Sequence, residues 1–317
     1  MILITGSAGF IGFHLALFYL NQNKKVIGVD NLNNYYDVKH KNKRLSILKK
    51  YKNFTFYKID LKEKKSLKKL DKLKKKIKNI VHLAGQAGVR FSILNPSTYI
   101  KNNIEAYIYL LEYFKLQKNV KSILYASSSS VYGDTDIKKT KNERMISVYA
   151  VSKKTLEHIS AVYNYMYKMN FIGMRFFTVY GPYGRPDMSI FKFFNNINKN
   201  KKIDVYNYGN HSRSFTYISD IIENIHRLII QTNKKNLNFN EIINIGNPKS
   251  VSLTHVIKLI EKKFNKKVKQ KFYPLQMGDI IKTEANIKDE QKKFKFKFKV
   301  NIEKGIDNFS KWFLNEK

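Results

Sequence analysis

The run Thr5-Gly6-Ser7-Ala8-Gly9-Phe10-Ile11-Gly12 constrains the fold of this chain more than any other segment. It follows the apolar residues Ile2–Thr5, which predict a strand, and it opens a helical pattern that continues to Asn21. Glycine allows a tight turn, close approach of the backbone to a pyrophosphate, and close packing of helix on strand. The helix N-terminus then presents free N–H groups to the phosphates. We therefore predict a dinucleotide-binding turn whose contacts come from Gly6, Gly9, Phe10, Ile11 and Gly12.

The first half of the chain alternates short apolar runs with helical patterns, which indicates strand–helix–strand units and a parallel sheet. The predicted strands are Ile2–Thr5, Lys25–Asp30, Phe54–Ile59, Ile80–Ala84, Ser122–Ser127 and Phe171–Phe176. The predicted helices are Ile11–Asn21, Lys39–Tyr51, Lys64–Lys75, Pro96–Leu116 and Tyr149–Met169. Five or six parallel strands of this kind make a doubly wound α/β sheet of the Rossmann type.

Beyond about residue 177 the regular alternation of strand and helix patterns is lost. We expect a short strand at Asp204–Tyr206, a helix at Val251–Phe264, a strand in the alternating tract Lys293–Val300 and a final helix at Ile302–Leu314. Residues 1–176 with about 211–245 are predicted to form the dinucleotide-binding domain, and 177–210 with 246–317 a smaller C-terminal substrate domain.

The net charge of +36 suggests a nucleic-acid-binding protein, but its origin favours a simpler explanation. Lysine, asparagine, isoleucine, tyrosine and phenylalanine are all over-used together, as AT-rich codons would produce. In Lys62–Lys78, leucines and an isoleucine recur at helical spacing between lysines, which predicts a core-facing stripe with a solvated basic face. We therefore expect no specific nucleic-acid partner.

The composition argues against several other classes of protein. The chain has no cysteine, so it forms neither disulfides nor cysteine-ligated metal sites, and no histidine spacing suggests a metal. No stretch approaches the roughly 18 to 20 apolar residues that a membrane span needs. The first predicted strand starts at Ile2, which leaves no room for a signal peptide, so we expect a cytoplasmic protein without membrane insertion.

Asp30 ends the second predicted strand, 18 residues after Gly12. A carboxylate at this position accepts hydrogen bonds from the ribose hydroxyls of a dinucleotide. The same charge repels a 2′-phosphate, so NAD is favoured over NADP.

A candidate catalytic set follows the fifth predicted strand. Tyr149 and Lys153 are four residues apart and therefore share one face of a helix. A tyrosine is a poor base at neutral pH unless a neighbouring cation stabilises its phenolate, which a lysine ammonium does. The serines at 127–130 follow the strand at the sheet edge where ligands bind in such folds, and one hydroxyl there could share a substrate proton with Tyr149.

Several motifs together resemble a known family, the extended short-chain dehydrogenases that act on nucleotide sugars. The first group is the glycine-rich opening, Asp30-Asn31-Leu32-Asn33, His82-Leu83-Ala84, Ser-Ser-Val-Tyr-Gly at 129–133, and the Tyr149/Lys153 pair. A second group is similar to the UDP-glucuronate 4-epimerases of bacterial capsule and lipopolysaccharide pathways. It comprises Gln86-Ala-Gly-Val-Arg90, Arg175-Phe-Phe-Thr-Val-Tyr-Gly-Pro182, Gly184-Arg-Pro-Asp187, Ile203-Asp-Val-Tyr-Asn-Tyr-Gly209 and Arg213-x-Phe-Thr-Tyr-Ile.

The resemblance implies a role for each matching residue. Ser128 is then the catalytic hydroxyl, Tyr149 the base, and Lys153 its activator and a ribose ligand. Further NAD contacts fall on Asn31, Asp60, Leu61, Leu83, Ala84, Gln86 and Asn103. Contacts to the UDP-sugar fall on Arg90, Val205, Tyr206, Arg213, Gln276 and Asp279. It also implies a homodimer through the helices near Pro96–Leu116 and Tyr149–Met169; Tyr107, Leu110, Leu111 and Phe114 give the first an apolar stripe that packing within the chain explains equally well.

The implied reaction is NAD-dependent epimerisation of UDP-glucuronate at carbon 4 through a keto intermediate. Dehydratases of the family carry an Asp-Glu pair, and uronate decarboxylases a Glu, where this chain has Ser129 and Ser130. These serines, Thr178 and Arg185 could instead hold the carboxylate of the uronate. The alternatives are a 4-epimerase for UDP-glucose or UDP-N-acetylglucosamine and, in a different class, a non-catalytic NAD-binding regulator.

Overall fold

The computed structural model describes residues 1–133, 145–234 and 238–316. The chain divides into two compact units, Met1–Arg175 with Ile225–Ile243, and Phe176–Asn224 with Asn244–Lys317. The segment that returns to the first unit is thus shorter than the 211–245 expected from sequence. None of the described helices is long and apolar enough to cross a membrane.

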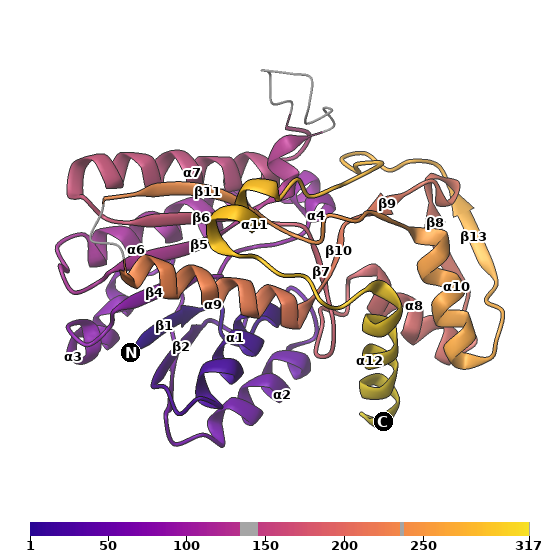
Figure 1. Ribbon diagram of the computed structural model, residues 1–317, viewed down its shortest axis with the longest axis horizontal. Coiled ribbons are helices and arrows are strands. Elements are labelled where there is room, and N and C mark those ends of the chain that lie inside the picture. The colour runs from indigo at the N-terminus through magenta and orange to yellow at the C-terminus, as the bar shows by residue number, and fades with distance from the viewer. Residues whose placement is uncertain (134–144, 235–237, 317) are drawn as a thin grey trace. The chain divides into compact units, whose positions relative to one another are not determined.

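The first unit is built on a seven-stranded parallel sheet flanked by helices, which confirms the predicted fold class (Figure 1). Its order is β11-β6-β5-β4-β1-β2-β3. The strands are β1 (Ile2–Thr5), β2 (Val26–Asp30), β3 (Phe54–Lys58), β4 (Asn79–His82), β5 (Ser122–Ser128), β6 (Phe171–Phe176) and β11 (Asn240–Ile245). The six predicted strands are all present, and β11 was not predicted. The chain changes direction across the sheet between β1 and β4, and ligands of such folds bind beyond the carboxyl ends of the strands at this point.

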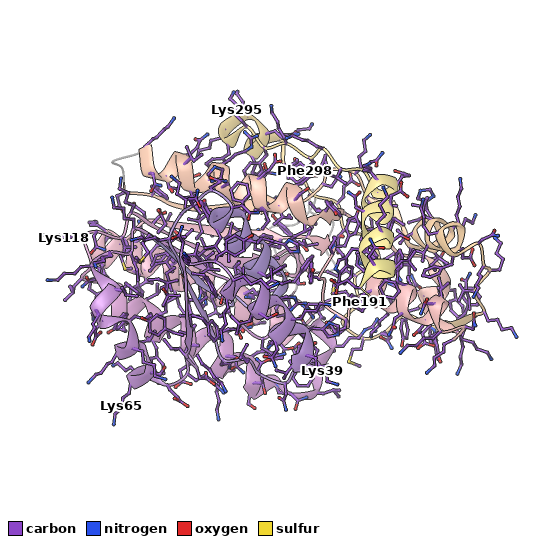
Figure 2. All side chains as sticks on the ribbon, turned by 90° about the horizontal axis from the view of Figure 1, so that it is seen from below. Lys39, Lys65, Lys118, Phe191, Lys295 and Phe298 are labelled. Carbon is purple, nitrogen blue, oxygen red and sulfur yellow. The ribbon has the colours of Figure 1, made fainter. Side chains whose placement is uncertain are left out.

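The helices of the first unit differ from the predicted ones mainly around residue 100. They are α1 (Phe10–Leu20), α2 (Val38–Lys49), the 3₁₀ helix η1 (Lys64–Leu70), α3 (Asp71–Lys74), α4 (Val89–Leu94), α5 (Pro96–Tyr99), the π-helical turn η2 (Ile100–Glu105), α6 (Ala106–Phe114), the 3₁₀ helix η3 (Ser129–Tyr132), α7 (Val148–Tyr167) and the later part of α9 (Ile218–Lys234). The single helix predicted at Pro96–Leu116 is therefore interrupted by a π-turn. Leu67, Leu70 and Ile77 are fully buried, whereas Lys65, like Lys39 and Lys118, projects outward from the ribbon in Figure 2, which confirms the solvated basic face.

The second unit combines three two-stranded sheets with four complete α-helices and the first part of α9 among its described residues. The sheets pair β7 (Thr178–Tyr180) with β10 (Phe215–Tyr217), β8 (Ile203–Tyr206) with β13 (Gln270–Tyr273), and β9 (Ser212–Arg213) with β12 (Val251–Ser252). The helices are α8 (Ser189–Asn198), α10 (Leu253–Phe264), α11 (Lys288–Phe294) and α12 (Ile302–Asn315), together with the 3₁₀ turn η4 (Asn207–Gly209). An aromatic cluster from α8 and α12 forms much of the core, with Phe194 and Phe309 at a ring-centre distance of 4.6 Å.

The predicted strand at Lys293–Val300 is wrong. Helix α11 runs to Phe294, and the residues that follow it up to Val300 form no strand, with Phe296 buried and the alternating lysines exposed. Their backbone groups bond to side chains of α9 instead of a neighbouring strand. Asn224 donates to the Lys297 carbonyl at 2.9 Å and accepts from its N–H at 3.1 Å. Asp220 accepts from the N–H groups of Lys299 and Val300, each at 3.0 Å.

Candidate active site

The glycine-rich turn between β1 and α1 has the close backbone packing that its sequence predicts. Gly6 adopts a positive φ of 72°, and the N–H of Gly9 donates to the Gly6 carbonyl at 2.9 Å. A methyl group on Gly12 would lie 2.1 Å from that same oxygen. Among the described residues, no side chain caps the N-terminus of α1, so its first N–H groups can face a phosphate. The turn therefore fits the pyrophosphate of a dinucleotide.

Asp30, at the carboxyl end of β2, holds the turn in place. Its side chain is buried, and its two oxygens accept from the N–H groups of Ala8 at 3.1 Å and Leu32 at 2.8 Å. Each carboxylate oxygen keeps a second lone pair, which can accept from a ribose hydroxyl. The Asn31 amide donates to Asp60 at 3.2 Å, so these predicted cofactor residues lie together.

Arg44 is a residue of this site that sequence reasoning missed. Its side chain is only 1% exposed, and its guanidinium donates to the Ala8 carbonyl at 3.0 Å and to the Tyr36 hydroxyl at 2.8 Å. Ala8 is thus held on its N–H side by Asp30 and on its carbonyl side by Arg44. In the sequence Arg44 is one cation of a basic helix, and nothing in its neighbours indicates this contact.

The segment after β4 lies against the other side of the turn. A methyl group on Gly6 would lie 2.7 Å from the Ala84 nitrogen, and the Ala84 N–H donates to the Thr5 hydroxyl at 3.2 Å. His82 shares a 2.8 Å hydrogen bond with the same hydroxyl. Burial, with the charge of Lys153 as a smaller cause, lowers the pKa of His82 to about 3. His82 is therefore a neutral structural residue at physiological pH.

Asn103 connects this segment to α7. It lies in the π-turn η2 with its side chain buried, accepts from the Gln86 N–H at 2.7 Å, and donates to the Gln86 carbonyl at 3.1 Å. Its amide also lies 2.9 Å from the Ser152 hydroxyl, to which it donates. π-Turns often occur at functional sites, and this one places a predicted cofactor residue between the sheet edge and the helix that carries Tyr149.

Tyr149 and Lys153 lie one turn apart near the start of α7. The helix is capped by Ser147, whose hydroxyl accepts from the Ala150 N–H at 3.1 Å. The Lys153 ammonium donates to the Ala126 carbonyl of β5 at 2.8 Å and lies 5.9 Å from the centre of the Tyr149 ring. Burial lowers the pKa of Lys153 to about 8. The lysine thus joins the tyrosine to the strand that leads into the serines.

Ser128 is the last residue of β5 and caps the short helix η3. Its hydroxyl accepts from the Ser130 N–H at 3.1 Å and donates to the Ser130 hydroxyl at 3.2 Å. Ser129 and Ser130 follow on η3 and are partly exposed. The three serines therefore form one compact turn at the carboxyl end of β5.

A buried ion pair beside this turn was not predicted. Arg175 donates to both oxygens of Glu157, from Nε at 2.8 Å and from Nη2 at 2.6 Å, and the Ser127 hydroxyl donates to Glu157 at 2.6 Å. Burial by itself would raise the pKa of Glu157, but Arg175, Ser127 and Lys154 lower it, and the net pKa lies below its usual value. Glu157 is therefore ionised at neutral pH.

The substrate residues predicted in the second unit lie around β8, β9 and the segment after β13. Arg213 approaches Asp279 at 3.8 Å and also donates to the Ile281 carbonyl at 2.9 Å. His211, which was not predicted, lies between the Tyr206 carbonyl at 3.2 Å and the Asp279 carboxylate at 3.9 Å. The Gln276 carbonyl accepts from the Asp279 N–H at 3.1 Å. These residues form one polar cluster, whereas the Val205 side chain is fully buried.

Three further residues were also predicted to bind the substrate. Arg185 makes a bidentate ion pair with Asp187, at 3.0 Å and 2.5 Å, so its charge is already compensated within its own loop. Thr178 begins β7 and is partly exposed, and Arg90 lies exposed on α4. Within the first unit, the structure thus brings the predicted cofactor and catalytic residues together.

Comparison with known proteins gives the family. The model of the NAD dependent epimerase/dehydratase family matches residues 2–246, and the chain belongs to this family. An uncharacterized protein of Methanocaldococcus jannaschii is 48% identical over 322 residues, which cover 100% of this chain and 97% of that protein. A UDP-glucuronate 4-epimerase of Thermodesulfobacterium geofontis is 38% identical, covering 98% of this chain and 95% of its own.

A solved structure agrees with these relatives. The UDP-glucuronic acid 4-epimerase of Bacillus cereus, crystallised with UDP-glucuronic acid and NAD, superposes with a TM-score of 0.91 at 29% identity. The match covers 100% of this chain and 99% of that chain. The family is NAD-dependent, which confirms the cofactor predicted from Asp30.

Proposed function

We propose that this chain is an isomerase that converts UDP-glucuronate to UDP-galacturonate by NAD-dependent epimerisation at carbon 4. The observation that carries the proposal is the buried Lys153, which bonds to the end of β5 at 2.8 Å and faces the Tyr149 ring, next to a turn that fits a dinucleotide. The relatives named as UDP-glucuronate 4-epimerases support the choice of reaction and sugar.

Three residues of the first unit manage the proton of the sugar 4-hydroxyl in this proposal. The Lys153 ammonium stabilises the Tyr149 phenolate, which takes the proton, while the Ser128 hydroxyl shares it in a hydrogen bond. When bound, NAD would supply the hydride acceptor for carbon 4 and, once reduced, the hydride donor for the transient 4-keto sugar. Tyr149 then returns the proton, so the reaction is redox-neutral over one turnover. Asp30, Asn103 and the glycine-rich turn hold the cofactor.

The second unit would bind the nucleotide. The guanidinium of Arg213 can contact a diphosphate, and Tyr206, Gln276 and Asp279 belong to the same cluster. A 4-keto uronate is a β-keto acid that loses carbon dioxide when the bond to its carboxylate stands perpendicular to the carbonyl plane. An epimerase must restrain this carboxylate, and we assign the restraint mainly to the hydroxyls of Ser129 and Ser130.

One observation favours a second candidate reaction. Because Asp187 already neutralises Arg185, the loop at 184–187 offers less net positive charge to a uronate than its sequence suggests. A 4-epimerase of UDP-glucose or UDP-N-acetylglucosamine would need no such charge. The non-catalytic NAD-binding alternative gains no support, since Ser128, Tyr149 and Lys153 are all present and lie around one strand end.

The deciding experiment is proton NMR of UDP-glucuronate with purified protein and no added NAD. UDP-galacturonate as product would establish the substrate, the reaction and retained cofactor together. A pentose product would mean that the serines do not restrain the carboxylate. If neither forms, even with NAD supplied, turnover of UDP-glucose or UDP-N-acetylglucosamine would support the second candidate, and no turnover at all would support the regulator. Tyr149→Phe should abolish whichever activity is found.

We also propose a homodimer. The predicted apolar stripe of α6, Tyr107, Leu110, Leu111 and Phe114, is buried inside the first unit, so it is not a free contact surface. Helix α7 instead exposes Val151, Val162, Tyr165 and Met166, with exposed fractions from 43% to 78%. Sedimentation at micromolar concentration that finds only monomer would contradict this assembly. A cytoplasmic role in polysaccharide biosynthesis is the biological setting that the proposed product suggests.

A further inference from the structure

Glu157 continues the row of catalytic residues along α7. Tyr149, Lys153 and Glu157 follow one another at intervals of four residues, so they share one face of the helix. Lys153 bonds to the Ala126 carbonyl, and Glu157 accepts from the Ser127 hydroxyl of the adjacent residue. Two successive turns of α7 are thus attached to two successive residues of β5.

Arg175 extends this connection to a third element. It lies on β6, and its guanidinium makes two parallel hydrogen bonds with Glu157. The pair is almost excluded from solvent, with side chains 11% and 5% exposed. A bidentate pair of this kind fixes relative orientation as well as distance.

The same guanidinium reaches the far end of the serine turn. It lies over the ring of Tyr132, 4.6 Å from its centre. Ser127 immediately precedes Ser128, and Tyr132 is the last residue of η3. One ion pair therefore contacts both flanks of the turn formed by Ser128, Ser129 and Ser130.

The position of Ser127 determines the direction of Ser128. Successive side chains of a strand point to opposite faces, so a hydroxyl of Ser127 fixed on Glu157 turns Ser128 to the other side. If Glu157 were lost, Ser127 would lose its acceptor and Arg175 would be left as an uncompensated buried charge. Both changes would displace the serine turn relative to Tyr149 and Lys153.

We propose that Glu157 and Arg175 are positioning residues, which act through Ser127 and Tyr132 to hold the serine turn in register with Tyr149 and Lys153. The proposal rests on the proposed function, since it assigns Ser128 to proton transfer and Ser129 and Ser130 to the substrate carboxylate. It gives the ion pair two effects on catalysis, one on the rate and one on the product.

The product effect distinguishes positioning from a purely structural role. If the serine turn shifts, the carboxylate of the 4-keto uronate is less restrained. The bond between carbons 5 and 6 then breaks, carbon dioxide leaves, and the electron pair passes into the carbon 4 carbonyl. The resulting enolate takes up a proton from water at carbon 5 to give a UDP-4-keto-pentose, and the hydride removed from carbon 4 would remain on the reduced cofactor. A variant that merely unfolds more readily makes less of every product without changing their ratio.

The experiment compares Glu157→Gln, Ser127→Ala, their combination and Glu157→Asp in the full-length holoenzyme. The matched control is Glu112→Gln, which removes a carboxylate that bonds to Lys115 and Tyr163 at 2.8 Å and 2.7 Å but contacts no residue of the serine turn. NMR gives kcat, KM and the fraction of decarboxylated product, and absorbance gives the NAD content.

We expect Glu157→Gln to lower kcat about 100-fold, as a displacement near 1 Å at a reacting centre does, with KM changed little and a raised decarboxylated fraction. Ser127→Ala should lower kcat roughly 10-fold. The double variant of Glu157→Gln and Ser127→Ala should have the same kcat as Glu157→Gln alone. Glu157→Asp, which keeps the carboxylate, should have a higher kcat than Glu157→Gln. The proposal is overturned if Glu157→Gln matches Glu112→Gln, or if its rate falls only with NAD content. If Glu157→Gln does not fold, an unchanged rate and product ratio in Ser127→Ala overturns it. A wild-type protein inactive on UDP-glucuronate would instead refute the proposed function.

Discussion

The buried Lys153 makes a quantitative prediction about stability. Its pKa falls from 10.5 to about 8 on burial, so below pH 8 the folded protein carries an ammonium that would be better solvated in the unfolded chain. A difference near 2.5 pKa units corresponds to about 3 kcal/mol of unfolding free energy. The penalty is fully present below pH 8, declines as the pH rises and is absent above about pH 10.5.

The test is the difference in stability between wild type and Lys153→Met, because other groups that titrate in this range cancel. Protein stripped of NAD is unfolded by heat or urea from pH 7 to pH 11, since bound cofactor would add its own stabilisation. Wild type should gain about 3 kcal/mol relative to the variant between pH 7 and pH 11, or roughly 6 to 12 °C in Tm for a domain near 200 residues. The exposed Lys65→Met serves as control and should show a constant difference. Parallel curves for wild type and Lys153→Met would refute the burial argument.

The remaining predictions concern activity and cofactor. Epimerisation should slow above about pH 8, because neutral Lys153 no longer stabilises the Tyr149 phenolate, and a profile that stays flat to pH 10 would contradict this role. Gly12→Ala should destabilise the protein by about 1 to 3 kcal/mol and lower its NAD content, since the new methyl group would lie 2.1 Å from the Gly6 carbonyl oxygen. A Tm and an NAD content equal to those of wild type would exclude that clash. Asp30→Asn should purify with less NAD, measured by absorbance, because the amide nitrogen cannot accept a hydrogen bond; undiminished NAD would mean that the carboxylate is dispensable.

The strands were predictable where burial is continuous and less so elsewhere. β1 and β2 are buried at every position, so their apolar runs identify them directly. β11 contains Asn240, Glu241 and Asn244, and its polar residues conceal it. In the tract after Lys293, Phe294 and Phe296 are buried and the alternating lysines are exposed, but alternation in the sequence does not reveal what the backbone bonds to.

The residues of the candidate site were likewise predictable only in part. Short-range motifs pointed to the glycine-rich turn, Asp30 and the Tyr149/Lys153 pair, because turn geometry and helical spacing depend on neighbouring residues. Arg44 and Glu157 escaped notice because their partners, Ala8 and Arg175, are distant in sequence. A bidentate pair between a helix residue and a strand residue leaves no periodic pattern in the sequence. The roles assigned to individual residues stay predictions until the variants are measured.

The segment after α11 has a consequence for aggregation. A tract that alternates lysine with phenylalanine or valine is well suited to pair with an identical tract from another molecule. Here Asn224 and Asp220 occupy four backbone groups at Lys297, Lys299 and Val300, so those groups cannot template an intermolecular sheet. Two short polar side chains on the first turns of α9 thereby keep a strand-like sequence from offering these backbone groups to another molecule.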